Sequence, residues 1–183
     1  MRIGSPHTHL IVLRGNSGSG KTSTARALQL ARERDLALVS QDVIRRDILR
    51  ERDAPGGANI ELLDTVARRC LDLGYHVLIE GILTASRYTS MLAALHRDHA
   101  GPSFFFYMDI SFAETLRRHA TRPEHLYFGA EQMSQWYLER DLLPEIDQTI
   151  IGEDSPLEVT VQRILCETGL AVSGEQAVNA ESR

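Results

Sequence analysis

Short apolar runs and amphipathic stretches alternate along most of the chain. Five strands, the last of them weak, are predicted by apolar runs over residues 9–13, 36–39, 77–79, 104–110 and 149–151. Helices are predicted by helical spacing over residues 21–33, 42–50, 60–73, 86–100, 112–122, 130–142 and 156–167. Strands that alternate with helices favour an α/β fold, with a parallel sheet, right-handed crossovers and helices on both faces. Ligands bind beyond the carboxyl ends of the strands in such sheets, so the candidate site residues are those that follow each strand.

Cap signals set the starts of two predicted helices. Ser111 and Glu114 have the spacing of a capping box, with Ser111 as the N-cap and Glu114 reaching back to it. Residues 155–158 combine an N-cap serine, a proline in the first turn and a second box glutamate. The Gly/Pro-rich segment 53–57 is expected to be a loop within the domain, because the helical pattern resumes directly after it.

The length of 183 residues fits one ordinary domain. Hydrophobic residues make up 43% and charged residues 25%, as in soluble globular domains, so most of the chain is expected to fold. We expect a single domain over residues 1–170 and a flexible C-terminal tail over residues 171–183, where apolar periodicity is lost.

Neither a membrane span nor an export signal is expected. The longest apolar stretch, residues 104–108, is far shorter than the roughly 20 residues of a bilayer span, and the first residues lack a charged and then apolar leader. Cys70 and Cys166 are far apart and fit no disulfide or metal pattern, which is typical of a reducing compartment. A cytoplasmic location is therefore expected.

The charge of the chain disfavours long nucleic acid as a partner. The net charge is 20 − 25 = −5, so basic residues would have to be strongly segregated to attract a polyanion. Of the 20 basic residues, 19 are arginine and one is lysine, Lys21. That single position needs its own physical reason.

A phosphate-binding loop follows the first predicted strand and supplies that reason. The pattern G-x-x-x-x-G-K-[ST] is formed by Gly15, Asn16, Ser17, Gly18, Ser19, Gly20, Lys21 and Thr22. The glycines let backbone N–H groups surround phosphate oxygens, Lys21 adds a compact charge between the β- and γ-phosphates, and Thr22 offers a hydroxyl to Mg²⁺. The broad planar fork of arginine would not fit such a cradle. A chance match in a Gly/Ser loop is the alternative, and the strand before and helix after the loop argue against it.

Charged residues also follow the second and third strands. Asp42 and Arg45 would share one helix face, which suits a general base beside a guanidinium that holds the acceptor or the transferring group. The alternative is that Asp42 caps a helix whose arginines are solvated. Glu80 ends the third strand, where P-loop proteins hold Mg²⁺ or its waters, although a strand-end acid can simply face water.

Two arginines end the helix that follows the fourth strand. Arg118 and Arg122 are four residues apart, and Pro123 stops the helix, so a mobile lid would carry both guanidinium groups over the nucleotide. A solvated helix end explains the same charges. Further along, Trp136 and Tyr137 either line an acceptor pocket or pack their helix on the sheet.

With these residues in place, the chain resembles the small P-loop kinases, a group that includes the 5′-hydroxyl polynucleotide kinases, the zeta-toxin kinases and chloramphenicol phosphotransferase. The resemblance covers about residues 8–165. It rests on four elements: the phosphate loop, Asp42 with Arg45, Glu80, and Arg118 with Arg122. It implies a three-layer α/β/α P-loop NTPase fold with five parallel strands in the order 2-3-1-4-5 and a helical lid over about residues 118–133.

The resemblance also implies roles for individual residues. Asp42 would be the general base, and Arg45 would contact the acceptor or the transferring phosphate. Arg118 would lie near the nucleotide and Arg122 on its phosphates, with ATP and Mg²⁺ as cofactors. The sequence leaves open whether Asp42 or Glu80 lies nearer the metal, whether ATP or GTP is preferred, and what the oligomeric state is.

The preferred hypothesis is a kinase that phosphorylates a hydroxyl of a small molecule such as a nucleoside, a sugar or an antibiotic. A 5′-hydroxyl kinase for short DNA or RNA ends is the second hypothesis, based on the matched aspartate and arginines. A non-catalytic nucleotide-binding module that recruits a partner is the third. The sequence does not identify the acceptor.

Overall fold

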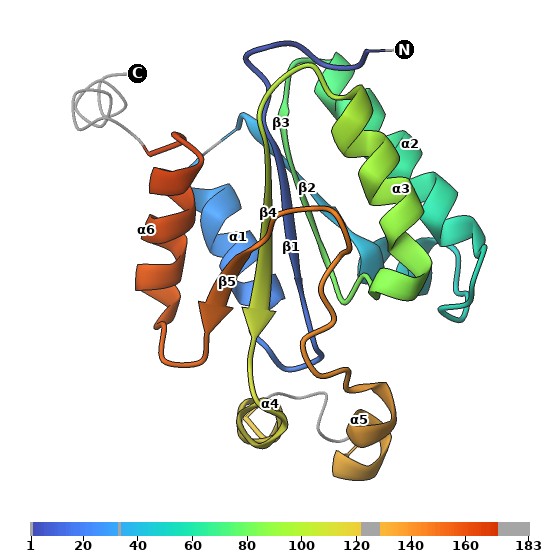
Figure 1. Cartoon of the computed structure of the whole chain (residues 1–183), viewed down its shortest axis with the longest axis vertical. Helices are drawn as coiled ribbons and strands as arrows, with labels where there is room; N and C mark the ends of the chain where they lie inside the picture. Colours follow the sequence, from blue (N-terminus) through green and yellow to red (C-terminus); the bar gives the residue numbers. More distant parts are fainter. Residues whose placement is uncertain (1, 33, 122–128, 172–183) are drawn as a thin grey trace.

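A parallel sheet forms the centre of the molecule (Figure 1). The computed structural model describes residues 2–32, 34–121 and 129–171. Within these residues the sheet has five strands in the order β2-β3-β1-β4-β5, and every neighbouring pair is parallel. The strands are β1 (Leu10–Gly15), β2 (Leu36–Ser40), β3 (His76–Gly81), β4 (Ser103–Asp109) and β5 (Thr149–Gly152). The predicted α/β class and strand order are confirmed.

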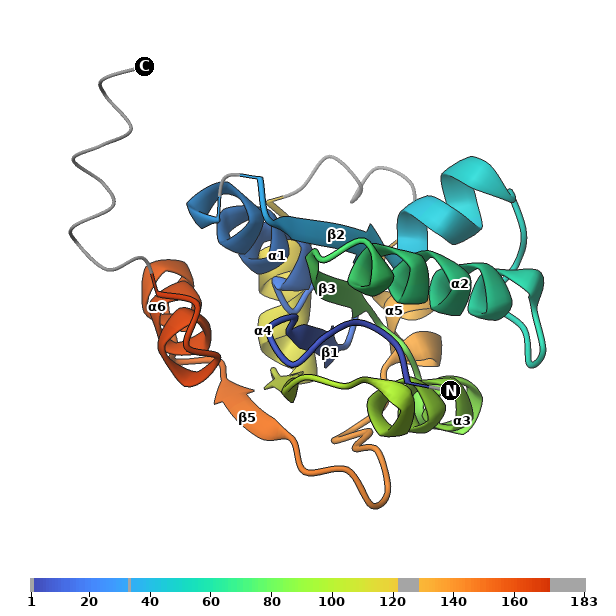
Figure 2. The same ribbon diagram turned by 90° about the horizontal axis from the view of Figure 1, so that it is seen from above.

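Helices cover both faces of the sheet, as Figure 2 shows. One face carries α1 (Lys21–Ala31) and α6 (Leu157–Glu167), and the other carries α2 (Ala58–Asp72) and α3 (Ala85–Asp98). A short π-helical segment, η1 (Val43–Ile48), follows β2. Two short helices, α4 (Phe112–His119) and α5 (Ala130–Trp136), lie beyond the carboxyl ends of the strands (Figure 1). They occupy the region where the sequence predicts a lid, whose residues 122–128 lie outside the described residues.

The central strand β1 is buried on both faces, as expected for a strand between two helix layers. Leu10 and Val12 point into the core under α2 and α3, whereas Ile11 and Leu13 point into the core under α1 and α6. Successive strand residues face opposite sides, so one apolar run supplies both cores. Each fully buried aliphatic side chain contributes about 1.5–3 kcal/mol. The resulting rigid sheet fixes the position of the loops at its carboxyl edge.

The helices predicted over 130–142 and 42–50 differ from the observed ones. The helix predicted over 130–142 ends at Trp136, because Tyr137 is extended (ψ 125°) and the backbone N–H of Leu138 donates to the side chain of Asn16. The helix predicted over 42–50 is the six-residue π-helix η1. Both segments make contacts at the carboxyl edge of the sheet, and those contacts override local helix propensity.

The predicted capping boxes form only in part. The Ser111 hydroxyl accepts from the N–H of Glu114, as predicted, but Glu153 rather than Glu114 accepts from the Ser111 N–H. At α6 the N-cap is Pro156, and the Ser155 hydroxyl contacts Thr160 instead of a helix N–H.

The predicted tail falls almost wholly outside the described residues. Leu170 is buried, Ala171 still bonds to α6, and residues 172–183 are not described. Among the helices that are described, none has the length and apolar character that a bilayer crossing requires.

Candidate active site

The loop between β1 and α1 has the geometry of an anion cradle. Gly15, Gly18 and Gly20 have positive φ angles of 148°, 80° and 103°. A Cβ on Gly18 would lie 2.7 Å from the backbone oxygen of Thr115, and one on Gly15 would lie 2.8 Å from that of Met108. Glycine is therefore required where β4 and α4 approach the loop. The loop leads directly into the N-terminus of α1, whose free N–H groups favour an anion.

Lys21 is the first residue of α1 and is only 7% exposed. Its Nζ donates to the backbone oxygen of Asn16 at 2.8 Å and lies 3.3 Å from the hydroxyl of Ser19. The side chain thus folds back across the loop, which keeps the ammonium group at its rim. Asn16 is itself fixed, because its side chain exchanges two hydrogen bonds with the backbone of Leu138.

Thr22 and Glu80 lie side by side. The Thr22 hydroxyl donates to Glu80 Oε2 at 3.3 Å, and the Ser40 hydroxyl donates to Glu80 Oε1 at 2.5 Å. Ser40 and Glu80 are paired in register at the ends of β2 and β3, and Glu80 is 3% exposed. A hydroxyl and a carboxylate at this position are the oxygen ligands that Mg²⁺ prefers. No cluster of three acidic, histidine or cysteine side chains that could hold a metal occurs in the described ranges.

Asp42 lies just after β2 and is held by two arginines. Its Oδ1 accepts from Arg45 Nη2 at 2.8 Å and from Arg46 Nε at 3.1 Å. Its side chain remains 48% exposed, so the carboxylate is oriented by its partners and still reachable by a ligand. Asp42 and Glu80 line one cavity, which we call the Glu80 cavity, together with Thr22. Of the two carboxylates, Glu80 is the one in contact with Thr22.

Arg118 connects three parts of the site. Its guanidinium donates to the backbone oxygens of Ser19 and Glu153, each at 2.9 Å, and to Glu114 at 2.6 Å. Hydrogen bonds from Arg117 and Arg118 lower the pKa of Glu114 to about 2, so this carboxylate is charged at neutral pH. The predicted partner Arg122 lies outside the described residues, and α4 ends at His119 rather than reaching it.

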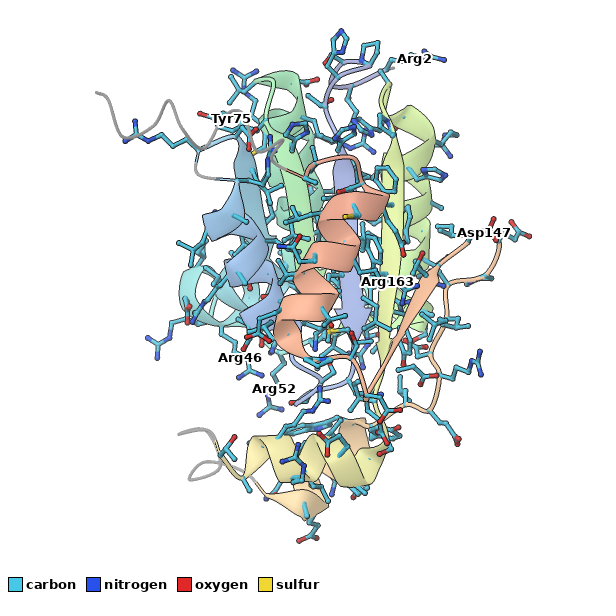
Figure 3. All side chains as sticks on the ribbon, turned by 90° about the vertical axis from the view of Figure 1, so that its left-hand side faces the viewer. Arg2, Arg46, Arg52, Tyr75, Asp147 and Arg163 are labelled. Carbon is cyan, nitrogen blue, oxygen red and sulfur yellow. The ribbon has the colours of Figure 1, made fainter. Side chains whose placement is uncertain are left out.

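Two further cavities lie at the carboxyl end of the sheet. The Arg118 cavity, of about 590 Å³, lies between the start of α1, α4 and the connection from β5 to α6. The arginine cavity, of about 570 Å³, lies between η1, the end of β3, the start of α3 and the end of α5. The second is lined by Arg45, Arg46, Arg52, Asp53, Ile82, Thr84, Arg87, Gln135, Trp136 and Leu138. Figure 3 shows Arg46 and Arg52 at the end of the sheet near α4 and α5, opposite Arg2.

Sequence reasoning did not identify Arg52 or Arg87 in this cavity, and it expected of Arg46 only that it shares a helix face with Asp42 and Arg45. Arg46, Arg52 and Arg87 lie on three different segments, and no local spacing links them. Of the two aromatic candidates, Trp136 lines the cavity, whereas the hydroxyl of Tyr137 donates to the backbone oxygen of Ile110.

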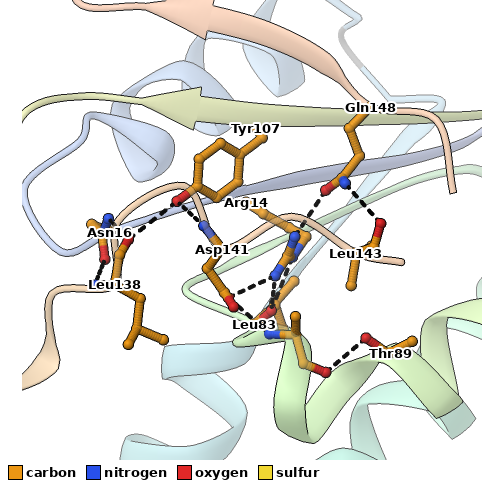
Figure 4. A network of polar contacts seen from close by, with 10 residues as sticks. Arg14, Asn16, Leu83, Thr89, Tyr107, Leu138, Asp141, Leu143 and Gln148 are labelled. Atoms are coloured by element: carbon orange, nitrogen blue, oxygen red, sulfur yellow. Dashed lines mark hydrogen bonds and ion pairs between the residues drawn. The ribbon is translucent and has the colours of Figure 1, made fainter. Parts of the chain in front are cut away.

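Sequence reasoning also missed Arg14, the last residue before the phosphate loop (Figure 4). Arg14 is completely buried and donates to the Leu83 backbone oxygen at 2.7 and 2.9 Å, to Gln148 at 2.8 Å and to Asp141 at 3.0 Å. Burial lowers the pKa of Arg14, and the nearby Asp141 carboxylate opposes this change. A charged residue at the end of an apolar strand was the available signal, because such a group needs buried partners.

The family comparison agrees with this geometry. Residues 10–136 match the family described as an AAA domain, from the first residue of β1 to the last residue of α5. The chain belongs to this AAA domain family. The matched range contains the phosphate loop. It also contains nine of the ten residues that line the arginine cavity, since only Leu138 lies outside it.

Solved structures of kinases share the fold. The APS kinase of Mycobacterium tuberculosis, solved in complex with AMPPNP and APS, is 19% identical over 91% of this chain and 98% of its own, with a TM-score of 0.67. A sugar kinase from Janibacter sp. is 20% identical over 91% and 96%, with a TM-score of 0.66. The tunicamycin resistance protein of Deinococcus radiodurans is 17% identical over 88% and 96%, with a TM-score of 0.61. No curated protein matches the chain. The predicted resemblance to small P-loop kinases is thus confirmed at the level of the fold.

Proposed function

We propose that this protein is a kinase that transfers the γ-phosphate of ATP, with Mg²⁺, to a hydroxyl of a small molecule. The observation that carries the proposal is the convergence of three groups at one sheet edge. These groups are the phosphate loop with Lys21, the contact between Thr22 and Glu80, and Asp42 held by Arg45. The AMPPNP and APS bound to the structurally similar APS kinase also support a nucleotide beside a small acceptor.

The residues present fit both ligands. A triphosphate suits the loop, because its glycines leave the backbone N–H groups uncovered and Lys21 supplies positive charge at the rim. Mg²⁺ suits the oxygen atoms of Thr22 and Glu80, and when bound it would neutralise charge on the β- and γ-phosphates. The nucleotide base would lie in the Arg118 cavity, and the acceptor would lie in the arginine cavity.

The proposed step is an in-line displacement. The acceptor oxygen bonds to the γ-phosphorus while the bond from that phosphorus to the bridging oxygen of ADP breaks, and the acceptor proton moves to the Asp42 carboxylate. Arg45 and Arg46 orient Asp42 for this role, and Lys21 stabilises the charge that develops on the phosphates. Arg118 holds the loop to α4, and Arg122 is proposed to reach the phosphates from the lid.

The test is transfer of the γ-phosphate from radiolabelled ATP to a panel of nucleosides, sugars, sugar acids and nucleoside monophosphates. Asp42→Asn should lower transfer about 100- to 10,000-fold, because the amide cannot accept the proton, while the Kd for Mg-ATP stays unchanged. Asp147→Asn, at an exposed aspartate on the connection before β5, is the matched control and should behave as wild type.

Three other results would redirect the proposal. Wild-type transfer by Asp42→Asn would remove Asp42 as the base. Selective transfer to a 5′-hydroxyl oligonucleotide would favour the polynucleotide kinase hypothesis over a small acceptor. Tight Mg-ATP binding without transfer to any acceptor or to water would instead indicate a regulatory nucleotide-binding module.

A further inference from the structure

The arginine cavity has a local charge opposite to that of the whole chain. Four guanidinium groups line it, and the carboxylates paired with them are Asp42 and Asp53, so the local balance is 4 − 2 = +2. The chain as a whole carries −5. Like charges repel, and gathering four of them around one cavity is unfavourable unless an anion compensates them.

Two residues that line this cavity each have a buried polar atom without a hydrogen-bond partner within the described residues. Arg45 Nε and the hydroxyl of Thr84 are buried, and neither makes a hydrogen bond to the protein. Arg45 donates with its other nitrogens to Asp42 and, at 3.5 Å, to the Glu51 backbone. Buried polar groups are normally paired, so an unpaired donor on each of two lining residues favours a ligand that accepts hydrogen bonds.

The other two arginines differ in how firmly they are held. Arg87 pairs with Asp53 at 2.7 Å, and Asp53 also accepts from the buried hydroxyl of Tyr88 at 2.9 Å. This network anchors the loop that carries Arg52 to α3. Arg52 itself is exposed at the cavity and has no ion pair among the residues that the structure describes.

Apolar side chains also line the arginine cavity. These are Ile82, Trp136 and Leu138, and the cavity volume of about 570 Å³ is within the roughly 300–1,000 Å³ of small-molecule sites. A guanidinium group forms two parallel hydrogen bonds with a carboxylate, sulfate or phosphate, which a neutral hydroxyl cannot match. The cavity therefore combines guanidinium groups that can bind an oxyanion with apolar side chains that can contact the organic part of a ligand.

We propose that the arginine cavity selects an anionic acceptor: an alcohol that carries a phosphate, sulfate or carboxylate group, bound through Arg52, Arg45 and Thr84. This inference rests on the proposed kinase function, because it names the class of acceptor for that site. It narrows the acceptor from any hydroxyl compound to one with an oxyanion group.

Matched pairs of compounds test the proposal. We would measure kcat/KM with Mg-ATP for adenosine and AMP, for glucose and gluconate, and for glycerol and glycerate. The anionic member of at least one pair should be preferred about tenfold or more, since one charge-assisted hydrogen bond is worth at least that factor. Equal use of both members in every pair, or preference for the neutral members, would overturn the proposal.

Variants of Arg52 test whether the preference for anionic acceptors arises in the arginine cavity. Arg52→Gln should raise KM for the anionic acceptor about tenfold, with kcat, the melting temperature and the Kd for Mg-ATP unchanged, and Arg52→Lys should restore part of the loss. Arg97→Gln, at a solvent-exposed arginine on α3, is the matched control. An equal rise in KM for the neutral partner would contradict oxyanion recognition by Arg52.

Calorimetric titration of the same compounds without ATP separates this proposal from the kinase function. Anion-selective binding that Arg52→Gln weakens about tenfold, without any phosphate transfer, would support the cavity proposal and overturn the kinase proposal. Transfer without anion preference would retain the kinase and overturn the cavity proposal. Absence of both binding and transfer would overturn both.

Discussion

Arg14 and the arginines of the cavity lie at the same edge of the sheet but differ in what surrounds them. Arg14 has no exposed surface, and all three of its nitrogens donate to protein oxygens. In the cavity, Arg45 keeps one buried nitrogen unpaired and Arg52 is exposed without an ion pair in the described ranges. An arginine thus serves as a structural group with all its nitrogens hydrogen-bonded at Arg14, and as a group with spare donors for a ligand in the cavity.

The hydrogen bonds of Arg14 also support the wall of the arginine cavity. Leu83 adopts a left-handed backbone conformation (φ 47°), which costs a non-glycine residue about 1–2 kcal/mol. Its carbonyl receives two hydrogen bonds from Arg14, and Asp141, the ion-pair partner of Arg14, accepts from the first N–H of α3. Leu83 directly precedes Thr84 on the cavity wall. Arg14 is therefore a positioning residue for that wall.

The largest expected effect is the loss of Arg14. Arg14→Met should lower the free energy of unfolding by about 3–5 kcal/mol, because Asp141 and the Leu83 carbonyl lose a buried partner. Chemical denaturation of wild type and variant measures the difference. Arg52→Gln serves as the comparison and should change stability by less than about 0.5 kcal/mol, as expected for a surface position. A cost below about 1 kcal/mol for Arg14→Met would show that this buried network does not hold the edge together.

A smaller effect is expected when an arginine replaces the one lysine. Lys21→Arg keeps the charge but should lower kcat about 100-fold, because the wider guanidinium cannot fold back to Asn16 and Ser19 within the loop. Lys21→Ala removes the charge as well and should be at least as slow. Phosphate transfer under saturating Mg-ATP measures both. If the kcat of Lys21→Arg were close to that of wild type, the narrower shape of the lysine side chain would not explain why lysine is present at this position.

The fold could be predicted well because its signals are local. The apolar runs and the phosphate loop each lie within about ten residues, and they fixed the five strands and the entry into α1. The strand order came from family resemblance, because no short segment encodes which strands pair. The predicted end of α5 was wrong, because the backbone of Leu138 forms hydrogen bonds with the side chain of Asn16, 122 residues earlier in the chain.

The site could be predicted only where one segment supplies the chemistry. Lys21 and Thr22 belong to the loop motif after β1, and Asp42 lies just after β2, so short segments were enough to name them as candidates. The arginine cavity is assembled from η1, a loop, the start of α3 and the end of α5, and its charge balance appears only in three dimensions. The role of Arg14 depends on Asp141 and Gln148, more than 120 residues away.

The amino edge of the sheet extends the comparison, because its histidines are buried or partly buried whereas the carboxyl edge gathers arginines. His9 and His76 stack with ring centroids 4.8 Å apart, and His99 lies 3.1 Å from the hydroxyls of both Thr8 and Ser103. Burial is the main cause that lowers the pKa of each of these histidines below 6.5. The folded state therefore binds protons on them less readily than the unfolded chain does.

The smallest expected effect follows from these histidines. The contribution of these histidines to the free energy of unfolding should be fully present above about pH 6.5, the ordinary histidine pKa. It should fall as the pH drops below that value, because the unfolded state then takes up more protons than the folded state. The slope is limited to about 1.4 kcal/mol per pH unit for each proton. His99→Gln keeps polar contacts to Thr8 and Ser103 but cannot gain a proton, so denaturation between pH 7.5 and 5.5 should give a shallower slope than in wild type. An unchanged slope would mean that His99 is protonated as readily in the folded protein as in the unfolded chain, and that this edge of the sheet tolerates charge as the arginine cavity does.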